Sequence, residues 1–211
     1  MPLPVVNDLV TPPNISSLGD ALLANPPVTK DNTVFKPKRG NASWVGNKLT
    51  IVGEGLVNYW FIPAVQDAVS YCVVHCNGSG DAYVISDQYG GCEYHELYNA
   101  TFGQLAFLHV YRGGGTTAQY TLAPGWVLRS VKRSAAIAAA GGMNGSNWSV
   151  SCINRSVTPP VVATKFVHVE GYPNIRVTME DNGDTPYGPA AGGSGAAARP
   201  PGSTPPTRTG P

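Results

Sequence analysis

The chain has 211 residues, of which 42% are hydrophobic and only 13% charged, and its formal net charge is +1. This length and apolar content suit one domain with a sizeable core, and the weak, scattered charge argues against nucleic acid as a main partner. No apolar stretch is long enough to span a bilayer, and the first ten residues lack the basic and apolar regions of a signal peptide.

The first 40 residues are expected to form an extended arm on the domain, because prolines, polar residues and short apolar runs alternate along them. Residues 16–24 (SSLGDALLA) are the first predicted helix, since a serine can cap its start and Pro26 limits its end.

Residues 41–185 are predicted to be the globular domain. Short runs of β-branched and aromatic residues follow one another between clusters of Gly, Pro, Asn and Asp, as in sandwiches and barrels. The predicted strands are residues 49–53, 56–62, 69–75, 81–87, 92–98, 104–112, 118–123, 126–131, 148–153, 161–169 and 174–179. A second helix is predicted over residues 129–142, an alanine-rich segment that ends in two glycines. We expect an α+β fold that is mostly β: a sandwich of antiparallel or mixed sheets with one or two small flanking helices.

Residues 186–211 are predicted to be a disordered tail, because they are rich in Pro, Gly and Ala and contain no aliphatic residue larger than alanine. Such a segment cannot bury enough apolar surface to offset the entropy of ordering it. We assign it no chemistry.

The four cysteines, Cys72, Cys76, Cys92 and Cys152, are compatible with two disulfides, a metal site, or buried thiols with one reactive member. If residues 69–75 form a strand, Cys72 and Cys76 lie about 13 Å apart, which is too far for a disulfide or a shared ion. The spacing also differs from that of zinc knuckles and haem-attachment motifs. We therefore expect no disulfide, metal or cofactor.

Asparagine begins an unusual number of N-x-S/T triplets. These triplets fit either a glycosylated secreted protein or asparagine-rich loops, and the lack of a signal peptide favours loops. The asparagines are Asn14, Asn41, Asn77, Asn99, Asn144, Asn147 and Asn154.

The densest group of polar functional side chains lies between residues 86 and 112. Gly90 and Gly91 precede Cys92, and two glycines allow a sharp turn that leaves the next thiol and its amide accessible to a carbonyl group. The hairpin strand that follows carries His109, which can reach the thiol as its base. The structural alternative is an inert buried thiol and a half-buried histidine that bonds a backbone carbonyl.

Other titratable residues nearby have weaker claims. His95 lies three positions after Cys92 on the same predicted strand, so its side chain points to the opposite face. Glu93 and Glu96 are expected to be solvated charges.

Two short motifs occur in this stretch: YGGC, which ends at Cys92, and HVY, which begins at His109. Their order and spacing resemble those of bacterial cysteine-dependent protein glutamine deamidases. That group includes cytotoxic necrotizing factor, the lethal-factor toxin that acts on a translation factor, and the chemoreceptor deamidase CheD. The resemblance covers residues 86–112 and departs from the family in having Gly91 where serine is frequent. It implies a β-sandwich with flanking helices and places Ser86 at the hydroxyl position six residues before the cysteine.

The resemblance also implies a mechanism. Cys92 attacks a glutamine carboxamide, amides near Gly91 and Cys92 stabilise the oxyanion, and His109, held by Ser86, protonates the departing ammonia. The expected partner is a protein substrate, such as a protein of a target cell, with no nucleic acid or membrane partner. The protein is then expected to be secreted without a classical signal peptide and to act in that cell, or otherwise to be cytoplasmic.

Two other classes remain open from the sequence. A non-enzymatic β-sandwich, such as a glycoprotein or virion-like structural module, would explain the triplets, the short strands and the low charge. A peptidase or amidase related to papain also uses a cysteine and a histidine, but there the histidine usually lies much further along the chain from the cysteine than His109 does from Cys92. In that case His168 would be the base.

Overall fold

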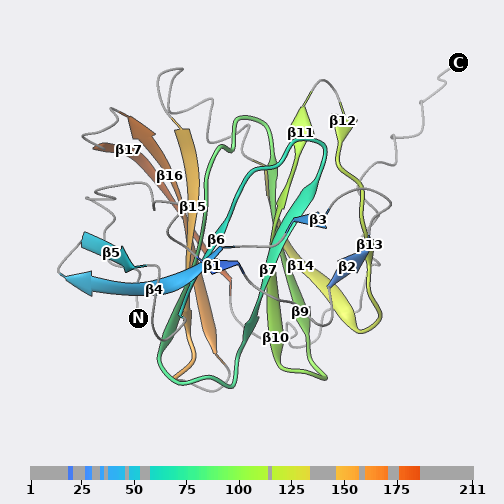
Figure 1. The fold of residues 1–211 in the computed structure, drawn as a ribbon, viewed down its shortest axis with the longest axis horizontal. Helices are drawn as coiled ribbons and strands as arrows, with labels where there is room; N and C mark the ends of the chain where they lie inside the picture. The colour runs from blue at the N-terminus through green and yellow to red at the C-terminus, as the bar shows by residue number, and fades with distance from the viewer. Residues whose placement is uncertain are drawn as a thin grey trace, which may run out of the picture.

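A computed structural model describes residues 19–20, 27–29, 34–35, 38–45, 48–52, 58–113, 116–133, 146–156, 160–170 and 176–185. These residues form two large β-sheets and two short ribbons, and Figure 1 shows the sheets as two layers of roughly upright strands. The predicted mostly-β sandwich is confirmed.

The first sheet has eight strands and the second has five. The first follows the order β1 (Gly19–Asp20), β4 (Lys38–Val45), β6 (Tyr59–Ile62), β8 (Asp81–Ser86), β15 (Ser146–Asn154), β16 (Val161–Glu170) and β17 (Arg176–Thr185), while β5 (Lys48–Val52) pairs with β4. The second follows the order β14 (Trp126–Arg133), β9 (Glu93–Asn99), β10 (Gln104–Val110), β7 (Val69–His75) and β3 (Val34–Phe35).

Both sheets are mixed, because β6 and β8 pair in parallel, as do β3 and β7, among otherwise antiparallel pairs. The two ribbons join β11 (Arg112–Gly113) to β12 (Thr116–Thr117), and β13 (Thr121–Leu122) to β2 (Val28–Thr29). Described pieces of the predicted arm thus pair with strands of the domain.

Three strands of the second sheet, β7, β9 and β10, are buried on both faces. A cluster between the sheets contains Val84, Ile153 and Phe166 from the first sheet and Val74 and Phe107 from the second. A separate cluster covers the outer face of the second sheet and includes side chains of β7, β9 and β10 together with residues of the segment 118–123 and of β2. These three strands therefore lack the alternation of buried and exposed residues that one-sided sheets show.

The structure differs from the sequence prediction in its helices: none occurs among the described residues. Within the first predicted helix, Gly19–Asp20 form β1, and the remainder lies outside the described residues. The second is wrong for residues 129–133, which belong to β14 and pair along β9. Residues 134–142 and the predicted tail, residues 186–211, lie outside the described residues. Within the described part, no helix is long and apolar enough to cross a membrane.

Candidate active site

Ser86 and His109 meet in the interior of the sandwich, and both are 0% exposed. Ser86 is the last residue of β8 in the first sheet, and His109 lies near the end of β10 in the second. Ser86 Oγ lies 2.8 Å from His109 Nδ1 and donates to the Ile62 carbonyl oxygen at 2.6 Å. A serine hydroxyl has a single proton, so Nδ1 of His109 must be the donor to Ser86. His109 Nε2 is therefore left unprotonated.

The Tyr89 ring covers His109. The two ring centroids lie 4.3 Å apart, with an angle of 17° between the ring planes. His109 Nε2 is buried and has no hydrogen-bond partner among the described residues. Burial lowers the pKa of His109 to about 3, so the imidazole is neutral at pH 7. The sequence reasoning gave Tyr89 no role, although its place directly before the two glycines and Cys92 was visible.

Cys92 lies on the same face of the second sheet as His109. Tyr94 pairs directly with His109, and residues two apart on a strand share a face, so Cys92 is a diagonal neighbour of the histidine. Such neighbours lie about 7–8 Å apart, a separation that an aromatic or long side chain can span. The thiol is 5% exposed, and no hydrogen bond joins it to His109.

The environment of the Cys92 thiol acts on its pKa in two directions. Burial is the largest effect and raises the pKa, and the Glu93 carboxylate adds to it. The backbone amides of Arg112, Cys92 and Gly91 oppose this by hydrogen bonding, which favours the thiolate. In this closed arrangement the thiol is neutral, and the same amides are the donors from which an oxyanion site can be built.

The two glycines before Cys92 differ in their surroundings. A Cβ on Gly91 would lie 3.2 Å from the Arg112 carbonyl oxygen, so a side chain there would press against the backbone of β11. A Cβ on Gly90 would meet nothing within 4 Å. The left-handed residue of this turn is Gln88, with φ of 60°, rather than either glycine.

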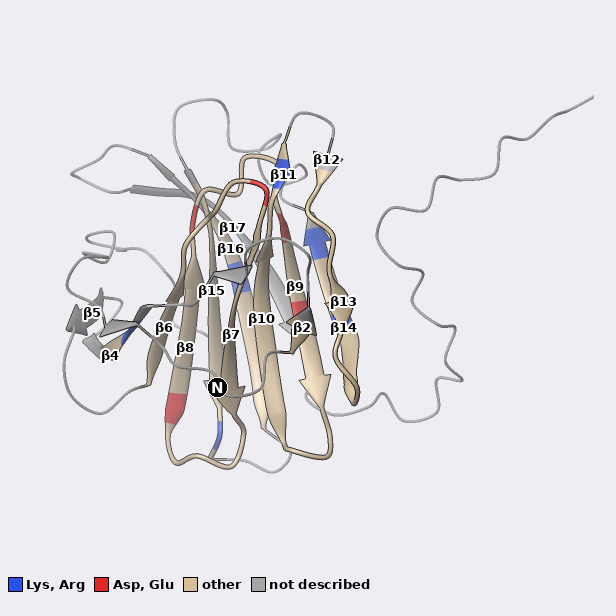
Figure 2. Cartoon of the chain, turned by 45° about the vertical axis from the view of Figure 1, so that its right-hand side comes forward, with Lys and Arg blue, Asp and Glu red and all other residues tan. Residues whose placement is uncertain are grey.

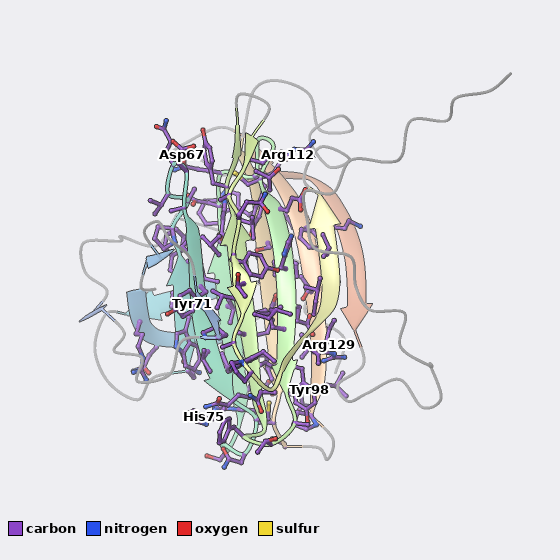
Figure 3. All side chains as sticks on the ribbon, turned by 90° about the vertical axis from the view of Figure 1, so that its right-hand side faces the viewer. Asp67, Tyr71, His75, Tyr98, Arg112 and Arg129 are labelled. Carbon is purple, nitrogen blue, oxygen red and sulfur yellow. The ribbon has the colours of Figure 1, made fainter. Side chains whose placement is uncertain are left out.

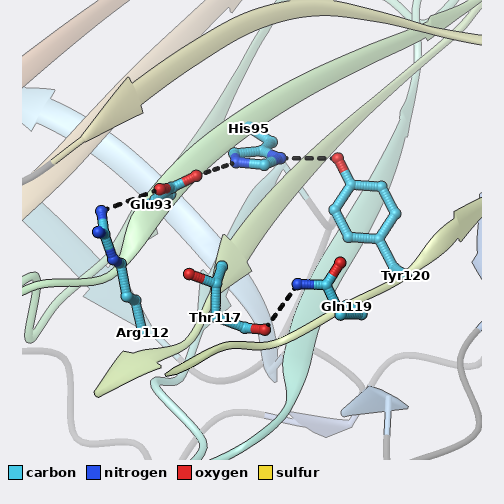
Figure 4. A network of polar contacts seen from close by, with 6 residues as sticks. All are labelled: Glu93, His95, Arg112, Thr117, Gln119 and Tyr120. Carbon is cyan, nitrogen blue, oxygen red and sulfur yellow. Dashed lines mark hydrogen bonds and ion pairs between the residues drawn. The ribbon is translucent and has the colours of Figure 1, made fainter. Parts of the chain in front are cut away.

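On the opposite face of β9 lies a second polar network (Figure 4). His95 bonds Glu93 Oε2 through Nε2 at 3.0 Å and Tyr120 Oη through Nδ1 at 2.6 Å. Arg112 lies 3.5 Å from the other oxygen of Glu93. The expectation that His95 points away from Cys92 agrees with this placement.

The expectation that Glu93 and Glu96 are solvated is wrong, because their side chains are 4% and 0% exposed. Charged residues lie scattered over both sheets in Figure 2, and these two lie on β9, which has neighbouring layers on both faces. Glu96 pairs with Arg129 at 3.1 Å. Arg129 also lies over the Tyr98 ring, at the end of the sheet away from Arg112 (Figure 3).

Three further residues singled out in the sequence, His168, Asn99 and Asn147, are described at least in part. His168 is in β16, where only its backbone is described. Asn99 and Asn147 are buried, so neither can carry a glycan in the folded chain. Their side chains hold loops: Asn99 accepts from the Phe102 amide, and Asn147 donates to the Tyr89 carbonyl.

The four cysteines are free thiols. Among the described residues, no cluster of His, Cys, Asp or Glu side chains is arranged to hold a metal ion. Comparisons with models of protein families, with curated proteins and with solved structures found no match for this chain.

Proposed function

We propose that the chain is a cysteine hydrolase that deamidates glutamine side chains of a protein substrate, with Cys92 as the nucleophile and His109 as the base. The observation that carries the proposal is the hydrogen bond from His109 Nδ1 to Ser86, with Ser86 anchored on the Ile62 carbonyl. It fixes the tautomer in which Nε2 can accept a proton, on the face of the sheet that Cys92 shares.

The reaction follows from these roles. Cys92 Sγ attacks the carboxamide carbon while its proton passes to His109 Nε2, and the amides near Gly91 and Cys92 stabilise the oxyanion. The tetrahedral intermediate collapses by breaking the C–N bond, and His109 returns the proton to the departing ammonia. Water activated by His109 then attacks the thioester, which releases glutamate and restores the thiol.

The experiment measures ammonia release and the mass change of a glutamine-rich probe, unfolded casein, incubated with the purified chain. Cys92→Ala should abolish release, and His109→Ala should lower it by about 10²–10⁴-fold, the usual contribution of a general base. Ser86→Ala should lower it less, because water can partly replace an orienting hydroxyl. Cys152→Ala is the matched control, since it deletes the same atom from a strand of the first sheet. A wild-type chain that releases no more ammonia than Cys92→Ala contradicts the proposal.

The burial of the pair favours a second candidate, a non-enzymatic structural β-sandwich. In that case Ser86 and His109 are a satisfied polar pair of the core, and Cys92 is an inert thiol whose pKa burial raises. All four thiols would then react slowly in the native protein.

If the chain is a deamidase, its substrate is a protein. This could be a protein of a target cell, reached by secretion without a classical signal peptide, or otherwise a cytoplasmic protein.

A further inference from the structure

Tyr89 occupies the space that a substrate must reach. Its ring is 1% exposed and lies flat on the imidazole, while His109 itself is 0% exposed. His109 Nε2 is itself buried, so a glutamine side chain cannot approach it in this arrangement. The reaction proposed above needs an arrangement in which this ring has moved.

The backbone and side chain of Tyr89 are held by two residues of β15. The Tyr89 amide donates to the Asn147 carbonyl oxygen at 3.2 Å, and Asn147 Nδ2 donates to the Tyr89 carbonyl oxygen at 3.0 Å. Ser149 Oγ donates to Tyr89 Oη at 3.3 Å. These three hydrogen bonds tie the segment to the first sheet, whereas Cys92 and His109 belong to the second.

The segment around Tyr89 also has the features of a hinge. Gln88 adopts a left-handed conformation, with φ of 60°, that is unfavourable for a residue with a side chain. Gly90, on the other side of Tyr89, is exposed and has open space where a Cβ would be. A change at these two residues can swing the ring outward without moving β8 or β9.

We propose that Tyr89 is an autoinhibitory lid over Cys92 and His109, held shut by Asn147 and Ser149 and opened by rotation about residues 88 and 90. The biological role of the lid rests on the proposed function, whereas the alkylation test below does not depend on that function. Tyr89 and Cys92 belong to the same buried cluster, so opening is expected to uncover the Cys92 thiol together with His109 Nε2. The partner that opens the lid is the protein substrate, whose glutamine side chain takes the place of the ring.

The test follows alkylation of each cysteine by iodoacetamide in the native full-length chain, read by peptide mass spectrometry. Tyr89→Ala removes the ring and should raise the rate at Cys92 at least tenfold. Asn147→Ala keeps the ring but removes one bond of the clamp, so it should raise the rate by a smaller factor. Tyr98→Ala is the control, because Tyr98 packs against the same core cluster but lies at the other end of β9.

Cys72 reports the integrity of the fold within each sample, because it is 0% exposed and reacts only when the core opens. A faster Cys92 with an unchanged Cys72 supports the lid. An unchanged Cys92 in folded Tyr89→Ala, or an equal rise in Tyr98→Ala, overturns it. If Tyr89→Ala unfolds and all thiols react, Asn147→Ala decides by the same two criteria.

Ammonia release separates the lid from the proposed function. If Cys92 becomes reactive in Tyr89→Ala but no chain releases ammonia from the probe, the lid stands and the deamidase proposal fails. If the wild type releases ammonia and Tyr89→Ala leaves Cys92 as slow as before, the function stands and the lid fails.

Discussion

His109 is a base that the fold keeps neutral. In the folded chain its pKa is about 3 because of burial, whereas an ordinary histidine titrates near 6.5. Between these values the unfolded chain binds a proton that the folded chain does not, so acid favours unfolding. The free energy of unfolding should therefore fall as pH falls from 6.5 toward 3, by about 1.4 kcal/mol for each pH unit from this group.

The variant that isolates this effect is His109→Gln, whose amide can still donate to Ser86. We expect the difference in unfolding free energy between wild type and His109→Gln, from urea titrations at pH 4, 5, 6 and 7, to shrink steadily as the pH falls. A difference that is constant with pH would mean that His109 titrates normally in the folded chain.

Part of the arrangement of Ser86, Cys92 and His109 could be predicted from the sequence. The glycine turn and the hairpin spacing suggested that Cys92 and His109 share a site, and the family resemblance added Ser86, which the structure brings to His109. The cover by Tyr89 and the complete burial of His109 depend on how the first sheet packs on the second. Strand alternation within one segment carries no information on that packing.

Among the elements, β14 contains an irregularity with a chemical consequence. Its pairing with β9 shifts between Leu128 and Ser130, and the intervening Arg129 reaches Glu96. An extra residue in a strand breaks the regular alternation, so a side chain can point to the face opposite the one that alternation predicts. Burial, opposed by Arg129, raises the pKa of Glu96 to about 7.

Arg129→Ala should therefore destabilise the chain strongly at high pH, by about 3–5 kcal/mol, because it leaves a buried carboxylate without its partner. At pH 5 the loss should be smaller, since Glu96 is then protonated. The contribution of Glu96 to the stability of the wild type therefore falls as pH rises from 4.5 through 7, because the folded chain keeps a proton on this group that the unfolded chain has released.

Urea unfolding at pH 5 and pH 8 measures both effects. Arg155→Ala is the control, since the bonds of Arg155 within the described part of the chain go to the uncharged backbone carbonyls of Ser79 and Gly80, and it should show the same loss at both pH values. An equal loss for Arg129→Ala at pH 5 and pH 8 would show that Glu96 does not change its charge in this range.

The elements also show which patterns predict strands. Residues 69–75 and 81–86 are strands as expected, because β-branched and aromatic residues fill them between turn residues. β4 was missed because KRGNASWV carries two basic residues, a glycine and an asparagine before its apolar end. The helix predicted from Arg129 failed because the alanine run begins after residue 133, whereas residues 126–133 are fixed by pairing with β9.

At the scale of the whole molecule, the pairing of β17 with β16 marks where the described sandwich ends. The register runs from Val162 opposite Thr185 to Glu170 opposite Arg176, so a chain cut after Thr185 keeps every pair. The sequence beyond it, rich in Pro, Gly and Ala, has too little apolar surface to add to the core. The truncated chain 1–185 should therefore melt at the temperature of the full chain.

Differential scanning calorimetry of chains 1–211, 1–185 and 1–170 tests this boundary. For a domain of this size, about 1 kcal/mol of stability corresponds to about 2–4 °C in melting temperature, so a contribution from the tail would be visible. Chain 1–170 is the control, because it removes β17 and leaves one edge of β16 unpaired, and it should melt well below the other two. A drop of several degrees in chain 1–185 would place part of the stabilising structure beyond Thr185.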